Sequence, residues 1–197
     1  MKILLSIIII SCSFLVGIQN ETKFKFNAPP EWKKETIKFP LDFAPEIDYQ
    51  GFEELRFAPG MFDPHADSYF TYTFFWCLKG ERKITPEALA DNLTRYFKGL
   101  CRAVGNGRGL NIDLEKIKAE VENYSAHDKR YKNMYHAKIA TFDPFNKGEA
   151  ISLNLEIALL DNKKPDQTVM IFCVSPKGFP ESVWKQLREI RDSFEIS

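Results

Sequence analysis

Alternation of apolar and polar residues predicts most of the strands in this chain. The strongest pattern covers Ser68–Leu78, where large apolar side chains occupy every second position and the positions between them are also mostly apolar. Because both faces of such a strand are suited to burial, we predict that it lies centrally in a sheet covered on both sides. Thr168–Val174 is apolar throughout and predicts a second central strand.

Weaker patterns predict the remaining strands, at Glu35–Phe39, Phe52–Ala58, Lys116–Glu122, Tyr135–Thr141 and Ile151–Leu159. In the last of these strands, a polar face opposes the aliphatic one and consists of Ser152, Asn154 and Glu156. The connections between the later strands are short and polar, so an antiparallel meander is the simplest topology.

Apolar positions spaced three and four residues apart predict two amphipathic helices. Thr85, Pro86 and Glu87 suit the start of the first helix, as a cap, a first-turn proline and an acid near the positive end of the dipole. Gly105 favours a helix end in the left-handed region, and Pro180–Phe194 forms the second helix. Strands flanked by two such helices predict an α+β fold, with an antiparallel β-sheet and helices packed on its faces.

The N-terminal residues differ in composition from the rest of the chain. Residues 1–20 start with Met1-Lys2, continue in an isoleucine-rich apolar run and end in polar residues, which is the order of a secretory signal. We therefore predict a signal segment over residues 1–20, an N-terminal arm over 21–34 and a single globular α+β domain over 35–197. The expected localisation is export, to the periplasm or outside the cell.

Two kinds of processing remain open for the signal segment. Ile9-Ile10-Ser11-Cys12 resembles a bacterial lipobox, which makes Cys12 a candidate lipidation site and the protein a candidate membrane-anchored lipoprotein. Ordinary cleavage near Gly17–Asn20 is the alternative that we favour. Counted through Ile18, an uncleaved segment approaches the length of a bilayer span, so contact with a membrane is expected only through this segment or a lipid.

Charge and aromatic content narrow the classes of partner. Lys and Arg number 27, as do Asp and Glu, so the chain lacks the net basic charge that nucleic-acid binding requires. Seventeen Phe, seven Tyr and three Trp suit either an aromatic core or a surface that binds an unknown protein or a small apolar ligand. Nothing in the sequence indicates a cofactor.

The cysteines outside the signal segment do not form a metal or redox motif. Cys77, Cys101 and Cys173 are far apart and share no CxxC spacing, which argues against a zinc site. All three fall in predicted strands or helices with apolar neighbours. We expect them to be buried free thiols.

The best candidate for catalytic chemistry is the loop Asp63-Pro64-His65-Ala66-Asp67. Asp63, His65 and Asp67 could hold a divalent metal, or an aspartate could orient the imidazole as a base. The same residues are common turn formers, which favours a structural role for the loop. We expect His136, in a predicted strand, to be partly buried or on the surface rather than a catalytic base.

The order of elements resembles the PsbP-like α/β/α sandwich. The matching residues are Phe39-Pro40-Leu41 and Gly51–Pro59 near the start, and Leu187–Phe194 at the end. The resemblance implies that sandwich fold and a non-catalytic accessory or binding role. We therefore favour an exported non-enzymatic binding or accessory module of the bacterial cell envelope, with a secreted hydrolase or metal-dependent enzyme that uses the Asp63–Asp67 loop as the alternative.

Overall fold

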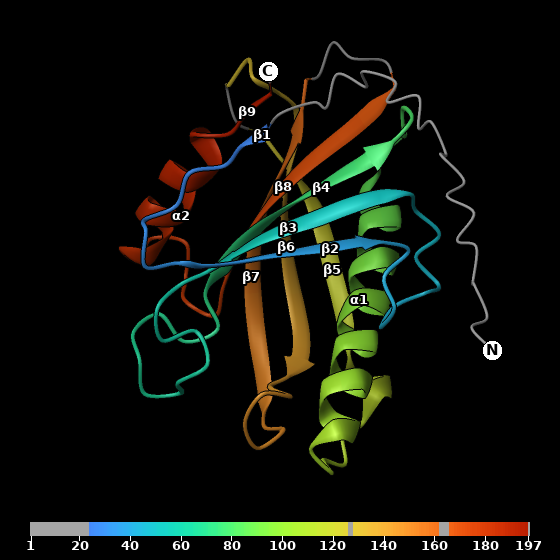
Figure 1. Ribbon diagram of the computed structural model, residues 1–197, viewed down its shortest axis with the longest axis vertical. Helices are drawn as coiled ribbons and strands as arrows, with labels where there is room; N and C mark the ends of the chain where they lie inside the picture. The colour runs from blue at the N-terminus through green and yellow to red at the C-terminus, as the bar shows by residue number, and fades with distance from the viewer. Residues whose placement is uncertain (1–23, 126–127, 162–165, 197) are drawn as a thin grey trace, which may run out of the picture.

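An antiparallel sheet forms the centre of the molecule. The computed structural model describes residues 24–125, 128–161 and 166–196, so the predicted signal segment, Cys12 and His127 lie outside the described residues. Within that part of the chain, seven strands follow the order β2-β3-β4-β8-β7-β6-β5 (Figure 1). They are β2 (Lys33–Phe39), β3 (Gly51–Phe57), β4 (Tyr72–Lys79), β5 (Lys118–Tyr124), β6 (Tyr131–Phe142), β7 (Ala150–Leu160) and β8 (Gln167–Ser175).

The sheet consists of two antiparallel meanders joined at its middle. Strands β2, β3 and β4 pair in sequence order, as do β5, β6, β7 and β8, and β4 pairs with β8. The predicted meander is therefore confirmed. The two strands predicted to be central occupy the third and fourth positions, and both are buried on their two faces.

The two helices cover opposite faces of the sheet. Helix α1 (Pro86–Gly107) packs against one face near β5 and β6, and α2 (Val183–Asp192) packs against the other face near β8 and β4 (Figure 1). The predicted cap holds, since Oγ1 of Thr85 accepts a hydrogen bond from the amide of Ala88 over 3.3 Å. The α+β fold with an antiparallel sheet is thus confirmed. Neither helix combines the length and apolar character that a membrane span requires.

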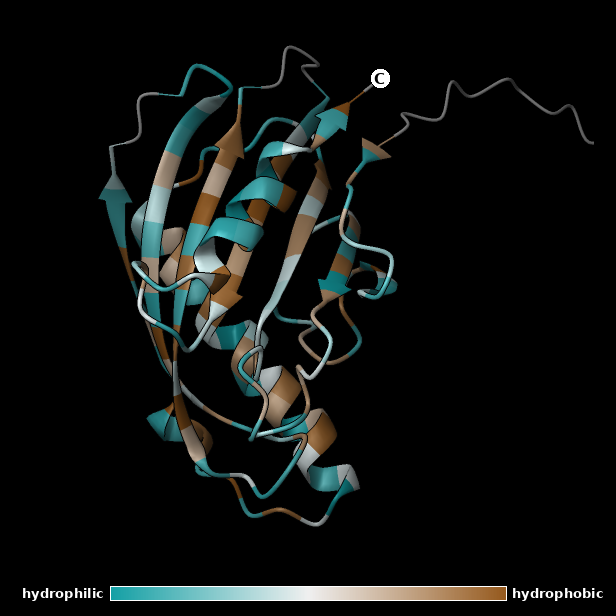
Figure 2. Cartoon of the chain, turned by 90° about the vertical axis from the view of Figure 1, so that its left-hand side faces the viewer, coloured by the Kyte–Doolittle hydropathy of each residue, from teal (hydrophilic) through white to brown (hydrophobic). Residues whose placement is uncertain are grey.

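Each face of the sheet has its own hydrophobic core. The larger core lies under α1 and includes Phe74 and Trp76 of β4, whereas Phe75 of the same strand belongs to the smaller core under α2. Figure 2 shows α2 in front of the strands with a largely hydrophilic surface toward the viewer. Phe26 and Trp32 of the N-terminal arm are buried in the smaller core.

A separate two-stranded sheet joins the first and last segments of the chain that the structure describes. Strand β1 (Phe24–Lys25) pairs antiparallel with β9 (Glu195–Ile196), the last strand of the chain. The ring of Phe24 lies 6.0 Å from that of Phe194, centroid to centroid. The N-terminal arm is therefore ordered from residue 24 onward and forms part of the layer that contains α2.

Several predicted boundaries differ from the structure. Strand β4 begins at Tyr72 rather than Ser68, because Ala58–Thr71 forms consecutive turns in which the amide of Phe70 donates to the carbonyl of Met61 over 2.9 Å. Helix α1 continues through Gly105 to Gly107, and Gly109 has the left-handed φ of 69° instead. Gly105 lies inside the helix, where a Cβ would lie 2.9 Å from Cδ1 of Ile112, the movable end of that side chain.

The other two boundary corrections concern shorter segments. Lys116 lies in a 3-10 turn (Leu114–Lys116), so β5 begins only at Lys118. The second helix starts at Val183 rather than Pro180, because the residues before it form turns. Neither change alters the faces on which the apolar side chains lie.

Candidate functional site

The loop predicted to carry chemistry is exposed. Asp63, His65 and Asp67 are all exposed, and the contact between the first two is a turn in which Oδ1 of Asp63 accepts from the backbone amide of His65 over 2.9 Å. No side-chain hydrogen bond or ion pair joins the three side chains. Across the described residues, no group of three or more His, Cys, Asp or Glu side chains is placed to hold a metal ion.

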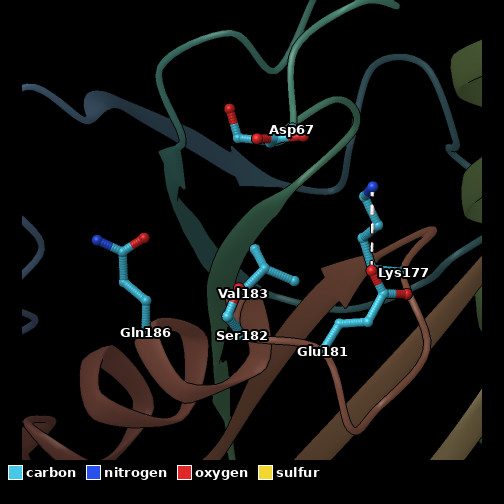
Figure 3. A pocket seen from close by; sticks show the side chains of 7 residues that line it. Asp67, Lys177, Glu181, Ser182, Val183 and Gln186 are labelled. Carbon is cyan, nitrogen blue, oxygen red and sulfur yellow. Dashed lines mark ion pairs between the residues drawn. The ribbon is translucent and has the colours of Figure 1, made fainter.

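Asp67 lines a shallow polar pocket beside the start of α2. Figure 3 shows its carboxylate across the pocket from residues of α2 and of the segment that precedes the helix. The ammonium of Lys177 pairs with the carboxylate of Glu181 over 3.9 Å in the same pocket. The cation of Lys177 is already paired with Glu181. The pocket therefore does not present a cluster of like charges to a ligand.

The three described cysteines are free and buried, as predicted. Burial raises the pKa of the Cys77 thiol to about 11 and that of Cys173 to about 12. Because the thiolate is the reactive form, neither group is a ready nucleophile at neutral pH. Cys101 lies against Thr141, with its Sγ 3.6 Å from the hydroxyl oxygen, and burial raises its pKa as well.

An apolar cavity lies between α1 and the half of the sheet formed by β2, β3 and β4. Its volume is about 250 Å³. Helix α1 packs closest to β5 and β6, so the space between it and β3 is filled only by side chains, and these leave the cavity open. We call it the aromatic pocket; it is lined by Glu35, Ile37, Phe43, Leu55, Phe57, Met61, Phe62, Phe70, Tyr72, Tyr96, Leu100, Val104 and Phe145.

Two loops frame the rim of the aromatic pocket. One loop is 58–71, between β3 and β4, and the other is the turn at 143–149, between β6 and β7. Tyr69 donates its hydroxyl hydrogen to Oδ2 of Asp143 over 2.6 Å, and Nδ2 of Asn146 donates to the carbonyl of Phe62 over 3.1 Å. The rings of Phe62 and Phe145 meet edge to face with centroids 5.0 Å apart. These contacts fasten one loop to the other.

Backbone strain is located at the wall of the aromatic pocket. Phe70 is a buried, bulky residue with a φ of 50°, and it is the one non-glycine residue of the described chain in this region of conformation. Such a conformation is unfavourable for a large side chain and persists only where the surroundings hold it. Strained residues of this kind are concentrated at binding and active sites, so the position of Phe70 makes this pocket a candidate binding site.

A fully buried carboxyl lies behind the aromatic pocket. Oε1 of Glu53 accepts a hydrogen bond from the hydroxyl of Tyr96, and Oε2 accepts one from Nε1 of Trp76, each over 2.8 Å. Burial raises the pKa of Glu53 to about 7, against the opposing effect of these two hydrogen bonds. A carboxyl with this pKa is partly protonated at neutral pH, and its tyrosine partner forms part of the pocket wall.

A cluster of ionic side chains lies on the opposite face of the sheet, under α2. Glu156 of β7 is only 2% exposed, and its carboxylate accepts from Arg188 over 2.6 and 3.1 Å and from Arg191 over 2.9 Å. The sequence placed Glu156 on a polar face of its strand, whereas the structure buries it. The available signal was the pair of arginines three positions apart on the inner side of the second helix.

His136 lies beside this cluster and is partly buried, as predicted. Its ring is stacked between Tyr124 and Phe179, with centroids 4.0 and 4.2 Å away. Nε2 of His136 has no hydrogen-bond partner among the described residues and lies 3.8 Å from Oε1 of Glu156. Desolvation lowers its pKa, so the neutral form is favoured and the stack acts mainly as packing.

Sequence comparisons do not place the chain in a known group. No protein-family model matches it, and no curated protein matches it with a significant score. The functional argument therefore depends on the geometry of the aromatic pocket. The sequence left open an aromatic core or an aromatic binding surface and named no lining residues, because the lining comes from β2, β3, β4, α1, the segment that holds Phe43 and both rim loops.

Proposed function

We propose that this protein is a non-enzymatic binding module and that its aromatic pocket holds a small apolar ligand. The observation that carries the proposal is the cavity of about 250 Å³ whose walls are almost entirely aliphatic and aromatic. Ligand pockets are concave and mostly apolar, with few polar groups. The strained Phe70 and the fastened rim loops support the proposal, because a preformed site loses little entropy when it binds.

The size of the cavity indicates the size of the ligand. An engineered apolar cavity of about 150 Å³ is large enough for benzene. At about 250 Å³, the aromatic pocket suits a fused ring pair or a short acyl chain of comparable volume. Edge-to-face and offset contacts with the phenylalanine and tyrosine walls favour a ring.

The cellular setting is part of the proposal. The apolar N-terminal residues support an exported module of a bacterial cell envelope, either free in the periplasm or secreted, or lipidated at Cys12. Kinship with the PsbP-like sandwiches is likewise proposed, supported by helices on both faces of an antiparallel sheet. Mass spectrometry of the mature N-terminus tests the setting, and an intact Met1 would contradict both forms of processing.

Titration with tryptophol, a neutral indole alcohol, tests binding in the aromatic pocket. We expect the amide signals of Leu55, Tyr72 and Leu100 to shift in two-dimensional NMR spectra. Leu100→Trp places a ring in the pocket and is expected to abolish these shifts, with Val104→Phe as a second filling variant. Lys185→Trp is the matched control, since it adds the same ring at an exposed position on α2.

The outcome is decisive in both directions. Saturable shifts that are confined to the pocket and lost in a folded Leu100→Trp or Val104→Phe variant support the proposal. An absence of saturable shifts with tryptophol up to millimolar concentration would refute it for ligands of this size. Shifts that persist in both filling variants would show that the ligand binds elsewhere.

A further inference from the structure

We infer that the aromatic pocket selects an apolar amine, whose rings occupy the cavity and whose ammonium group faces Glu35 at the rim. This inference rests on the ligand-binding function proposed above and adds the charge of the ligand to it. Glu35 is exposed and is the one charged residue among those that line the pocket. A ligand with a cationic end is therefore the one that this rim attracts.

A second carboxyl lies near Glu35 on the same face of the sheet. In the antiparallel pair of β2 and β3, Glu35 lies opposite Leu55, and Glu53 lies opposite Ile37. Glu35 and Glu53 are thus diagonal neighbours on the same face of the sheet, the face toward α1. Burial is the main cause of the raised pKa of Glu53, and the charge of Glu35 adds a smaller contribution.

The part of the chain that the structure describes supplies no cation to these two carboxyls. No Lys, Arg or His side chain of the described residues pairs with Glu35 or Glu53, and the hydrogen bonds to Glu53 come from the neutral Tyr96 and Trp76. Glu53 is only partly ionised at neutral pH because burial raises its pKa to about 7, so the exposed Glu35 is the main source of negative charge here. A bound ammonium group would provide the missing positive charge.

The neighbouring acid shows the contrast. Glu54 points to the opposite face of β3, where its carboxylate pairs with both Lys34 and Arg56. The adjacent acids of β3 therefore differ. Glu54, on the face away from the pocket, has two cationic partners, whereas Glu53, on the face toward it, has none among the described residues. The difference locates the unbalanced charge at the ligand side of the sheet.

The walls of the pocket favour a cation as well. Phe43, Phe57, Tyr72 and Tyr96 all line the cavity. An ammonium group near aromatic faces is attracted by the negative potential of the rings, and aromatic cages recognise such ligands in this way. A carboxylate ligand would meet repulsion from Glu35 and from the ring faces together.

Three indoles of similar size and different charge test the inference. Tryptamine is cationic, tryptophol neutral and indole-3-acetate anionic at pH 7.5, and each is titrated into the full chain by calorimetry or NMR. We expect tryptamine to bind about fivefold more tightly than tryptophol, as suits a solvent-screened ion pair, and indole-3-acetate to bind most weakly. Raising the salt concentration should reduce the advantage of tryptamine.

A charge variant separates recognition by Glu35 from general attraction. Glu35→Gln is expected to reduce the preference for tryptamine over tryptophol to about twofold or less, with the affinity for tryptophol unchanged. Glu189→Gln makes the same change in net charge at an exposed position on α2 and should leave the preference intact. Equal loss of both ligands in Glu35→Gln would overturn the inference, because it would show an effect on pocket shape.

The two proposals fail in different ways. Equal binding of all three indoles, or tightest binding of indole-3-acetate, would overturn the selection for amines and leave the binding function standing. No binding of any of the three would refute the binding function, and the selection with it. Preference for tryptamine that disappears in Glu35→Gln alone supports both.

Discussion

The hydroxyl of Tyr96 on α1 donates a 2.8 Å hydrogen bond to the carboxyl of Glu53 on β3. Both side chains are buried, and the bond connects α1 to β3, which lies farther from the helix than β5 and β6 do. One surface of Tyr96 faces the aromatic pocket, so the bond also fixes a wall of the proposed site. The protonation of Glu53 is consequently linked to folding.

We predict that Glu53 makes the protein less stable as pH rises from about 4.5 to 7. Its folded-state pKa is raised from 4.5 to about 7, so in this window the folded state binds a proton that the unfolded state releases. Stability from this group is full below pH 4.5 and is lost by pH 7, by on the order of 3 kcal/mol. Urea unfolding across this range measures the change.

The Glu53→Gln variant isolates this contribution. Gln keeps acceptor capacity for Tyr96 and does not titrate, so the difference in unfolding free energy between the native chain and the variant should vary with pH in this window. His136, whose pKa is lowered by burial, titrates similarly in both proteins and cancels in the difference. A difference that is constant between pH 4.5 and 7 would contradict the prediction.

Close backbone packing at Gly99 gives the second prediction. A Cβ at this position would lie 2.1 Å from the carbonyl oxygen of Phe43, which is backbone and cannot rotate away. We expect Gly99→Ala to destabilise the fold by about 1–3 kcal/mol, as overpacking of a dense interior does. Thermal or urea unfolding measures this loss.

Gly107, near the end of the same helix, is the matched control. A Cβ there meets nothing within 4 Å, so Gly107→Ala should raise stability by up to about 1 kcal/mol through helix propensity alone. Opposite signs for the same substitution in one helix distinguish packing from propensity. Equal effects at both positions would show that the contact with Phe43 is not tight in solution.

The ion cluster under α2 gives the third prediction. Glu156 neutralises Arg188 and Arg191, and the latter is itself buried. Removal of the carboxylate in Glu156→Ala takes from Arg188 its acidic partner and leaves the buried Arg191 with Asp192 alone, and we expect a loss of about 3–5 kcal/mol. Glu120→Ala removes an exposed partner of Lys118 and should cost less than about 1 kcal/mol. Comparable losses in both variants would contradict a special role for the buried cluster.

The elements were predicted well from the sequence where a single local pattern extends over a whole segment or marks its end. Strand β8 and the start of α1 at Thr85 are examples, because local chemistry alone decides them. It failed at Phe70, whose apolar alternation continues that of β4 although the backbone turns before Tyr72. This backbone turns because of hydrogen bonds between residues of the loop, such as that from Phe70 to Met61. The alternation of apolar and polar residues carries no information about such bonds.

The candidate site was harder to predict than the fold. Asp63, His65 and Asp67 attract attention because they are close in sequence, but they are exposed. Glu35 and Glu53 belong to different strands, and only the register of β2 on β3 makes them neighbours. That register, like the burial of Glu156, is a tertiary property.

The last prediction concerns the fastening of the rim loops. Tyr69→Phe removes the hydroxyl that donates to Asp143, while Asp143 still accepts from the amide of Phe145 over 2.9 Å and from Nδ2 of Asn146 over 2.7 Å. Because the carboxylate keeps partners, we expect a moderate loss of about 1–2 kcal/mol. The loss should be concentrated in the loop 58–71 rather than in the sheet.

Hydrogen exchange measures where this loss falls. The amide of Phe70, bonded to the carbonyl of Met61, should exchange about tenfold faster in Tyr69→Phe, whereas amides of β8 should not change. Tyr124→Phe is the control, since that exposed ring stacks on His136 and removal of its hydroxyl leaves the rim intact.

If the loop is the preformed wall of a binding site, tryptophol should bind Tyr69→Phe several-fold more weakly, because the strained conformation of Phe70 is then no longer held in place. Faster exchange with unchanged affinity would separate the two effects and show that the fastening serves stability alone.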